Sequence, residues 1–179
     1  MSFLDLEEID PQLPDGAYST YDQDCILPHL VGMDESEVYL EIGVDKGKSL
    51  AFARYYSGGF IYGIDITDTL QHENAFIKGK DIVYLVDGSD IVAKTWDKPI
   101  TLMFIDGEHT YEGVKRDWDN FSQFVRPGGT VFFHDCDSTS PGVVQLFDEI
   151  RDDPKWHNFI LYKTPIANTS MASCEKKDA

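Results

Sequence analysis

The chain of 179 residues lacks a cysteine framework, a long apolar run and a cluster of basic residues. Its cysteines, Cys25, Cys136 and Cys174, are odd in number and show no C-x-x-C spacing. This argues against a disulfide scaffold or a cysteine zinc site and favours reduced thiols. No apolar run approaches the roughly 18 residues that a membrane span needs. The acidic start MSFLDLEEID is wrong for a signal or transit peptide, so we expect a cytoplasmic protein without a membrane partner.

Positive charge is also scarce, because the formal net charge is −17 and the lysines and arginines are scattered. A nucleic-acid partner is therefore not expected. There is no G-x-S-x-G elbow and no Walker-type loop, so neither of those hydrolase classes is supported. With 42% hydrophobic and 26% charged residues, the chain has the composition of one globular domain.

From Val38 onward, short apolar runs alternate with helix-length segments. Strands are predicted at 38–42, 60–64, 82–86, 101–105 and 130–134, and helices at 48–56, 69–78, 89–94 and 111–124. Most of these runs are too continuously apolar for half-exposed strands, which indicates a parallel sheet covered on both faces. A helix at 141–151 and two strands at 159–163 and 170–176 follow, the last two close enough to pair as an antiparallel hairpin at the sheet edge. The pattern predicts an α/β, doubly wound fold.

The first 35 residues differ from the rest and hold Pro11, Pro14 and Gly16 before a predicted helix from Thr20 to Leu30. We divide the chain into an N-terminal cap at 1–35 and a main domain at 36–179. The cap is expected to help cover a pocket, with Tyr18 or Tyr21 touching a bound molecule. Because the cap is short, either the site is open or a second copy of the chain supplies a lid.

The first predicted strand ends in Glu41-Ile-Gly43 and continues through Gly47 and Ser49 into a helix. Glycines at such a turn let the backbone approach a ligand closely. The spacing is G-x-x-x-G, not the G-x-G-x-x-G of dinucleotide-binding folds, and the acidic turn would repel a pyrophosphate. A ligand with a positive charge suits Glu41 better. A plain tight turn is the alternative interpretation.

The second and third predicted strands also end in acids, Asp65 and Asp87. An acid at the first of these positions accepts the hydroxyls of a ribose in nucleotide-binding βαβ units, and the alternative is a helix N-cap. The turn Asp87-Gly88-Ser89 can present polar groups to an adenine edge. A capped helix start explains that turn equally well.

The fourth and fifth predicted strands deliver Asp106 and Asp135, with His109 and His134 close by in the sequence. Ligands in open parallel sheets sit outside the carboxyl ends of the strands, so these four side chains are expected to share one pocket. Imidazole titrates near working pH, which makes His109 a candidate base. Asp106, His134 and Asp135 are candidate metal ligands, and a purely hydrogen-bonding role for the acids remains open. Asp117, on the charged segment predicted as a helix, is expected to be solvated.

Five motifs occur in an order that resembles the class I S-adenosylmethionine-dependent methyltransferases. They are E-I-G-x-x-x-G-x-S at 41–49, Asp65, D-G-S-D at 87–90, F-I-D-G-E-H-T-Y-E-G-V-x-x-D at 104–117 and R-P-G-G at 126–129. The fourth motif resembles the corresponding motif of the small-molecule O-methyltransferases, the branch of the family that includes the macrocin and rhamnosyl O-methyltransferase-like enzymes. The resemblance spans about Val38 to Arg151.

This resemblance implies a Rossmann-like, mostly parallel, seven-stranded sheet of order 3-2-1-4-5-7-6 with helices on both faces. It implies O-methylation of a small hydroxylated acceptor by S-adenosylmethionine, with His109 and Asp106 as the catalytic residues. The implied cofactor-binding residues are Glu41, Gly43, Gly47, Ser49, Asp65, Ile66, Asp87, Gly88, Ser89 and Asp106. A cofactor-binding module without chemistry is the second hypothesis, and a nicotinamide dehydrogenase is disfavoured by the glycine spacing.

This sequence departs from the metal-binding pattern of the enzymes that it resembles. Those enzymes carry carboxylates at the end of the fifth strand, where this chain has His134-Asp135. Mg²⁺ prefers oxygen ligands, whereas a histidine nitrogen suits Mn²⁺ and similar ions better. Two interpretations stay open: His134 joins Asp106 and Asp135 around a cation, or it points into the core and leaves two acids.

Overall fold

The computed structural model describes residues 5–163 and 170–178. Residues 1–4 of the predicted cap, and 164–169 and 179 of the predicted main domain, lie outside that range. The strands are β1 (Val38–Ile42), β2 (Phe60–Asp65), β3 (Ile82–Val86), β4 (Ile100–Ile105), β5 (Val125–His134), β6 (Trp156–Lys163) and β7 (Ser170–Lys176). The helices are α1 (Leu6–Ile9), α2 (Thr20–Val31), α3 (Lys48–Tyr56), α4 (Ser89–Val92), α5 (Tyr111–Phe121) and α6 (Pro141–Ile150), with 3₁₀ turns at Asp10–Gln12, Ala93–Thr95 and Ser122–Phe124.

The strands form one seven-stranded sheet of order β3-β2-β1-β4-β5-β7-β6, which confirms the predicted order. Strands β1 to β5 pair in parallel, and β7 runs antiparallel to both of its neighbours. The carboxyl ends of β1, β2, β4 and β5 therefore meet at one edge of the sheet. That edge is where the predicted functional residues of these strands are placed.

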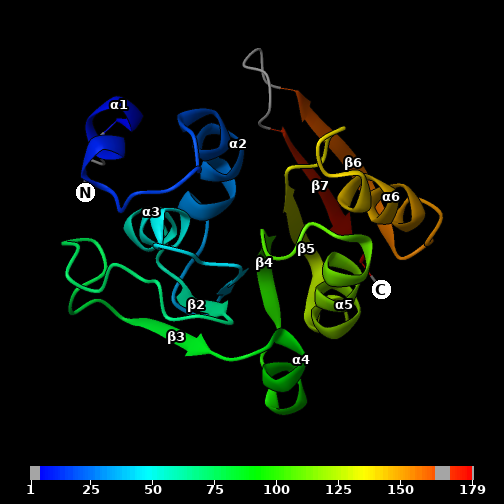
Figure 1. The fold of residues 1–179 in the computed structure, drawn as a ribbon. Helices are drawn as coiled ribbons and strands as arrows, with labels where there is room; N and C mark the ends of the chain where they lie inside the picture. The colour runs from blue at the N-terminus through cyan, green and yellow to red at the C-terminus, as the bar shows by residue number, and fades with distance from the viewer. Residues whose placement is uncertain (1–4, 164–169, 179) are drawn as a thin grey trace.

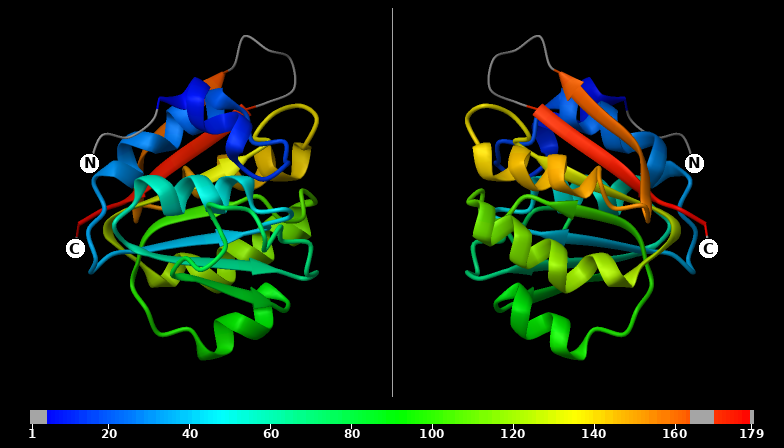
Figure 2. Two further views of the ribbon diagram at one scale, coloured as in Figure 1. Left: turned by 90° about the vertical axis from the view of Figure 1, so that its left-hand side faces the viewer. Right: turned by 90° about the vertical axis from the view of Figure 1, so that its right-hand side faces the viewer.

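Helices cover both faces of the sheet, as Figures 1 and 2 show. Helices α1, α2 and α3 pack on one face around Phe52, Phe104 and Phe132. Helices α5 and α6 pack on the other face around Phe121, Phe133 and Phe147. Alternate residues of the central strands feed the two cores, because successive strand side chains point to opposite faces. This arrangement explains why the strands are apolar throughout rather than at every second residue.

The N-terminal segment is fixed to the face that carries α3. Helix α2 begins with a capping box in which the side chains of Ser19 and Asp22 satisfy each other's backbone N–H groups. Further along the helix, the Gln23 amide donates to Asp10, which pairs with Lys48 of α3 at 2.8 Å. The helix predicted at 20–30 is thus confirmed, and the segment is anchored by buried polar contacts. The division into cap and main domain stays a prediction.

The helix predicted at 69–78 is wrong, because the structure has successive turns there. The Asn74 side chain accepts from the Phe76 N–H and donates to the Gln12 carbonyl oxygen. Asparagine that bonds to nearby backbone in this way competes with helix formation. Leu70 and Ile77 are nevertheless buried against α3 and the turn before it. The apolar residues of the 69–78 segment are therefore the buried contacts of a loop, not one face of a helix.

Several other segments differ in length from their predictions, among them α4, β5, β6, which begins at Trp156 rather than at residue 159, and α5, which ends at Phe121. The helix predicted at 89–94 is shortened to α4 and continues as a 3₁₀ turn, and β5 begins at Val125 rather than at residue 130. The early part of β5 contains Gly128 at a φ of 71°, where the pairing with β4 shifts register. Within the described residues, no helix has the length and apolarity to cross a bilayer.

Candidate active site

A cavity of about 660 Å³ lies outside the carboxyl ends of β1, β2 and β4. Of the predicted cofactor residues, Gly43, Asp65, Ile66, Asp87, Gly88, Ser89 and Asp106 line it. Glu41, Gly47 and Ser49 do not line it, and they lie behind the loop that forms one wall. The structure therefore gathers most of the predicted set around one space of a size suited to a small-molecule cofactor.

Asp65 organises the wall of the cavity that follows β1. One of its carboxylate oxygens accepts from the backbone N–H groups of Val44 and Asp45, each at 2.9 Å. The other oxygen accepts from the N–H of Thr67 at 3.0 Å. Instead of capping a helix, Asp65 ties together the loops that follow β1 and β2. Its predicted contact with a ribose stays a prediction, and its place in the cavity lining is compatible with that contact.

Gly43 allows β1 and β4 to deliver their loops side by side. Its φ is 88°, and a Cβ atom at this position would lie 2.2 Å from the Asp106 carbonyl oxygen. Neither the left-handed backbone nor this approach tolerates a side chain. Because Gly43 has no side chain, the carbonyl of Asp106 can pack directly against the loop that follows β1. The start of the loop that follows β4 is positioned in the same way.

Glu41 is fully buried behind the cavity wall. Its two oxygens accept from the hydroxyls of Ser49 at 2.6 Å and Tyr39 at 2.7 Å. Burial raises the pKa of Glu41 to about 8, although these two hydrogen bonds act in the opposite direction. Glu41 links β1 to the start of α3, and its predicted attraction for a positively charged ligand stays a prediction.

Glu41→Gln is expected to gain stability relative to wild type as the pH rises. Between the ordinary value of 4.5 and the folded pKa of about 8, the folded chain keeps a proton that the unfolded chain has released. Wild-type stability falls across this window by at most about 1.4 kcal/mol per pH unit from this group. Glutamine keeps the shape and has no such proton to lose. Urea titrations at about pH 5 and about pH 8 check this, and a difference between the two proteins that does not change with pH would contradict it.

The far wall of the cavity is built on a buried acid of α5. Asp117 is 3% exposed and accepts from the Ser89 hydroxyl at 2.5 Å. Burial raises the pKa of Asp117. The expectation from sequence that Asp117 is solvated is wrong, because it lies on the same helical face as Val114, Trp118 and Phe121. The helical spacing of Asp117 from these apolar residues indicates burial, whereas its charge indicates exposure to solvent.

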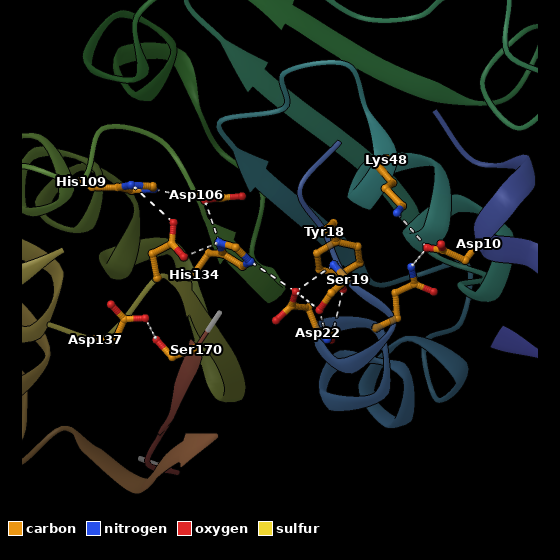
Figure 3. Close-up of polar contacts among 12 residues, drawn as sticks. Asp10, Tyr18, Ser19, Asp22, Lys48, Asp106, His109, His134, Asp137 and Ser170 are labelled. Carbon is orange, nitrogen blue, oxygen red and sulfur yellow. Dashed lines mark hydrogen bonds and ion pairs between the residues drawn. The ribbon is translucent and has the colours of Figure 1, made fainter. Parts of the chain in front are cut away.

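Asp106, His109, His134 and Asp135 form one cluster beside the cavity. Figure 3 shows Asp106 between His109 and His134. His109 Nε2 lies 3.3 Å from Asp106 Oδ1, and its Nδ1 lies 3.6 Å from Asp135 Oδ2. His134 Nδ1 lies 3.3 Å from Asp106 Oδ1 and 3.4 Å from Asp135 Oδ1. The four side chains therefore lie together at the strand ends, but they do not share one pocket as predicted, because Asp106 lines the larger cavity and the other three do not.

The two histidines of the cluster differ in exposure and in proton affinity. The hydrogen bond with Asp106 raises the pKa of His109, whose side chain is 37% exposed. Burial by itself lowers the pKa of His134, but Asp106, Asp135 and Asp22 raise it to about 12. In return, the two histidines lower the pKa of Asp106 against the effect of its burial. The two carboxylates of the cluster, together with that of Asp22, thus face two imidazole rings.

The donor atoms of Asp106, His134 and Asp135 all lie within 4.8 Å of one another. His134 is 4% exposed, and within the described part of the chain its Nδ1 has no well-formed hydrogen bond. A buried nitrogen of this kind, aimed at two carboxylates, fits a divalent cation. The residues present are therefore compatible with the metal set predicted from sequence. His134 is both buried and turned toward the acids, so the two open interpretations of this residue are not exclusive.

Sequence reasoning missed Asp22, which reaches the cluster from α2. Its Oδ2 lies 3.5 Å from His134 Nε2, on the side of the ring opposite to Asp106 (Figure 3). The S-x-x-D spacing signalled a helix start, but nothing in it signalled burial. Tyr18, by contrast, is 5% exposed and packs against Phe52 and Phe104. The predicted contact of Tyr18 or Tyr21 with an acceptor stays a prediction.

A second cavity, of about 530 Å³, adjoins the cluster on the side of His109. Hydroxyl groups are prominent in its lining, which includes Thr110, Tyr111, Thr139 and Ser140. His109 is the one member of the cluster that lines this second space, whereas Asp106 is the one that lines the first. The cluster therefore separates a larger cavity at the strand ends from a smaller one.

Comparisons with known proteins agree with this geometry. Residues 40–136 match the family model described as a methyltransferase domain. Uncharacterized protein R132 of Acanthamoeba polyphaga mimivirus is 27% identical over 158 residues, which cover 77% of this chain and 71% of that protein.

Among solved structures, an O-methyltransferase from Bacillus cereus in complex with SAH (S-adenosylhomocysteine) superposes with a TM-score of 0.73. It is 15% identical, over 96% of this chain and 90% of that one. The MycE methyltransferase from the mycinamycin biosynthetic pathway, in complex with Mg and SAH, gives a TM-score of 0.68. It is 20% identical, over 98% of this chain and 55% of that one. These likenesses show a shared fold.

Proposed function

The chain belongs to the methyltransferase domain family, and from this premise we propose that it methylates a hydroxyl oxygen of a small acceptor with S-adenosylmethionine as the donor. The observation that carries the proposal is the position of Asp106, which lines the larger cavity and also belongs to the cluster with His109, His134 and Asp135. A donor and an acceptor held in the two cavities would meet at this residue. The SAH in the Bacillus cereus O-methyltransferase and in MycE supports the choice of donor.

The larger cavity is assigned to the donor, which when bound supplies an electrophilic methyl group on a sulfonium. Asp65 keeps the 44–45 backbone in place and accepts the ribose hydroxyls, and the turn Asp87-Gly88-Ser89 takes the adenine end. Gly43 leaves room for the methionine end beside Asp106. The work of these residues is to fix the donor in one orientation, which is a large part of the catalysis of an in-line displacement.

The smaller cavity is assigned to the acceptor, whose hydroxyl faces His109. The imidazole lies at the boundary of the two spaces and is exposed enough to take a proton. Because Asp106 raises the pKa of His109, the basic form becomes available as the pH rises or as the charge of Asp106 is neutralised by another group. The hydroxyl-rich lining favours a polar acceptor over an apolar one.

A divalent cation is the remaining part of the proposal. Asp106, Asp135 and His134 Nδ1 would hold it, and when bound it would lower the pKa of an acceptor hydroxyl. The imidazole ligand favours Mn²⁺ over Mg²⁺. MycE was solved with Mg, which supports a divalent cation as part of the proposal.

The proposed partner is a small molecule rather than a nucleic acid or a membrane, and the net charge of −17 supports this. We place the protein in the cytoplasm because Cys25, Cys136 and Cys174 are all free thiols. A homo-oligomer, in which a second copy covers the open side of the site, is also part of the proposal.

Methyl-labelled S-adenosylmethionine, offered with a panel of small hydroxylated molecules in the presence of Mn²⁺ or Mg²⁺, tests this function. Wild type is expected to transfer label to oxygen. His109→Gln is expected to be slower by about 10²–10⁴-fold, the usual contribution of a positioned base. If wild type binds S-adenosylhomocysteine but methylates none of the panel under any metal condition, the result favours a binding module without chemistry.

A further inference from the structure

We propose that Asp22 of α2 is the positioning carboxylate of the metal site: it accepts the Nε2–H of His134 and thereby turns Nδ1 toward Asp106 and Asp135. This inference rests on the divalent cation in the proposed function and goes beyond it. It makes helix α2 a part of the metal site, although this helix supplies no metal ligand itself.

The two nitrogens of His134 face different groups. Nδ1 lies 3.3 Å from Asp106 and 3.4 Å from Asp135, whereas Nε2 lies 3.5 Å from Asp22 (Figure 3). The ring also stands edge-on against Phe104, at 5.9 Å between centroids and an interplanar angle of 88°. Its plane is therefore set by packing, and the remaining choice is which nitrogen keeps its proton when a cation displaces the other one.

Burial makes that choice energetically important. Asp22 is 0% exposed and His134 is 4% exposed. Within the described residues, Asp22 Oδ1 and both ring nitrogens of His134 are buried with no well-formed hydrogen bond. Unsatisfied buried polar groups of this kind are costly, and charged ones more so. A small closure of the gap between Asp22 Oδ2 and Nε2 satisfies one ring nitrogen and leaves Nδ1 as the nitrogen of His134 that needs a partner.

Asp22 is held in place without any help from His134. Its Oδ2 accepts from the Ser19 backbone N–H at 2.8 Å and from the Ser19 hydroxyl at 2.5 Å. One residue further, Gln23 ties the same turn of α2 to Asp10 and through it to Lys48 of α3. The carboxylate is therefore a fixed point of the helix start, against which the imidazole can be oriented.

The consequence for the site concerns the tautomer of His134. With Nε2 donating to Asp22, the lone pair of Nδ1 faces the space between the two acids. Without Asp22, the proton is better placed on Nδ1, where it bonds to a carboxylate and blocks the position of a cation. Carboxylates behind metal-bound histidines act in this way, and their loss typically weakens metal affinity by about 10–100-fold.

The test measures Mn²⁺ binding by electron paramagnetic resonance in wild type and three variants. Asp22→Ala removes the carboxylate and the cap of α2 together, and is expected to bind Mn²⁺ about 10–100-fold more weakly. Ser19→Ala removes the cap hydroxyl but keeps the carboxylate of Asp22, which the Ser19 backbone N–H still holds, and Asp24→Ala removes one exposed negative charge from the same helix. Both controls are expected to bind Mn²⁺ as wild type does.

A spectroscopic readout separates positioning from structural damage. Wild type with Mn²⁺ is expected to show electron-spin-echo modulation from a coordinated imidazole nitrogen, and Asp22→Ala to lose most of it. Asp22→Asn, which keeps the shape of the helix start, is expected to lie between the two. Equal Mn²⁺ affinity in Asp22→Ala and Ser19→Ala, or a wild type that binds no Mn²⁺, overturns the inference.

Calorimetry with S-adenosylhomocysteine on the same proteins keeps the two proposals apart. All variants are expected to bind it as wild type does, because Asp22 does not line the larger cavity. A wild type that binds Mn²⁺ in an Asp22-dependent way but no S-adenosylhomocysteine would refute the proposed function alone.

Discussion

Asp106→Asn is expected to abolish methyl transfer and to weaken Mn²⁺ binding by at least about 100-fold, since it removes a ligand rather than a group behind one. Asp106 is the residue that both histidines approach, each with a nitrogen at 3.3 Å from Oδ1. Asparagine keeps the shape and the backbone contact with Gly43, so the fold and the larger cavity should survive. Affinity for S-adenosylhomocysteine should therefore change far less than turnover does.

The charge of Asp106 also raises the pKa of His109, so Asp106→Asn should have a second measurable effect. The hydrogen bond with Asp106 is the main reason that the pKa of His109 is raised. In Asp106→Asn that pKa should fall back toward its ordinary value, which a histidine titration by nuclear magnetic resonance detects. Asp119→Asn is the matched control, because it removes a charge from an exposed ion pair with Lys115 on α5. If Asp106→Asn kept wild-type turnover and Mn²⁺ affinity, the cluster would not be the catalytic site.

Gly43→Ala is expected to lower the free energy of unfolding by about 3–5 kcal/mol, in the range of the most severe single substitutions. The left-handed backbone accounts for about 1–2 kcal/mol of this. The rest comes from the overlap of the new methyl group with the Asp106 carbonyl, 2.2 Å away, which forces the β1 and β4 loops apart. Because those loops form the cavity wall and carry Asp106, binding of S-adenosylhomocysteine should be lost as well.

Gly79→Ala is the control that isolates the backbone contribution. Gly79 has a φ of 68°, but a Cβ atom there meets nothing within 4 Å. Its substitution should cost only about 1–2 kcal/mol, the price of the left-handed conformation. Urea titrations of the two variants measure the difference. A Gly43→Ala protein no less stable than Gly79→Ala would show that the two loops separate easily, against the tight packing described above.

The fold was predictable because the strands are buried on both faces and each ends in a turn or an acid. Those features place Asp65, Asp106 and Asp135 at strand ends, and parallel strands bring their ends to the same edge. The family model confirms the resemblance seen in the motif order. The spatial grouping of His109 and His134 with these acids followed from the same reasoning.

The errors share a cause, which is that contacts between distant segments leave little trace in the sequence. The charge of Asp117 favours a solvated position, and the place of Asp22 at a helix start is fully explained by capping, yet both side chains are buried. The 69–78 segment has helical apolar spacing, but side-chain bonds of Asn74 win over helix formation. In each case a contact between distant segments decides the outcome, and only the folded chain contains it.

The central claim is that the cavity of about 660 Å³ at the strand ends holds S-adenosylmethionine beside Asp106. Isothermal titration calorimetry with S-adenosylhomocysteine, run alongside NADH, tests this most directly. One equivalent of S-adenosylhomocysteine is expected to bind, with affinity reduced by Asp65→Ala and with no comparable binding of NADH. No detectable binding of S-adenosylhomocysteine with or without Mn²⁺, or tighter binding of NADH, would contradict the account.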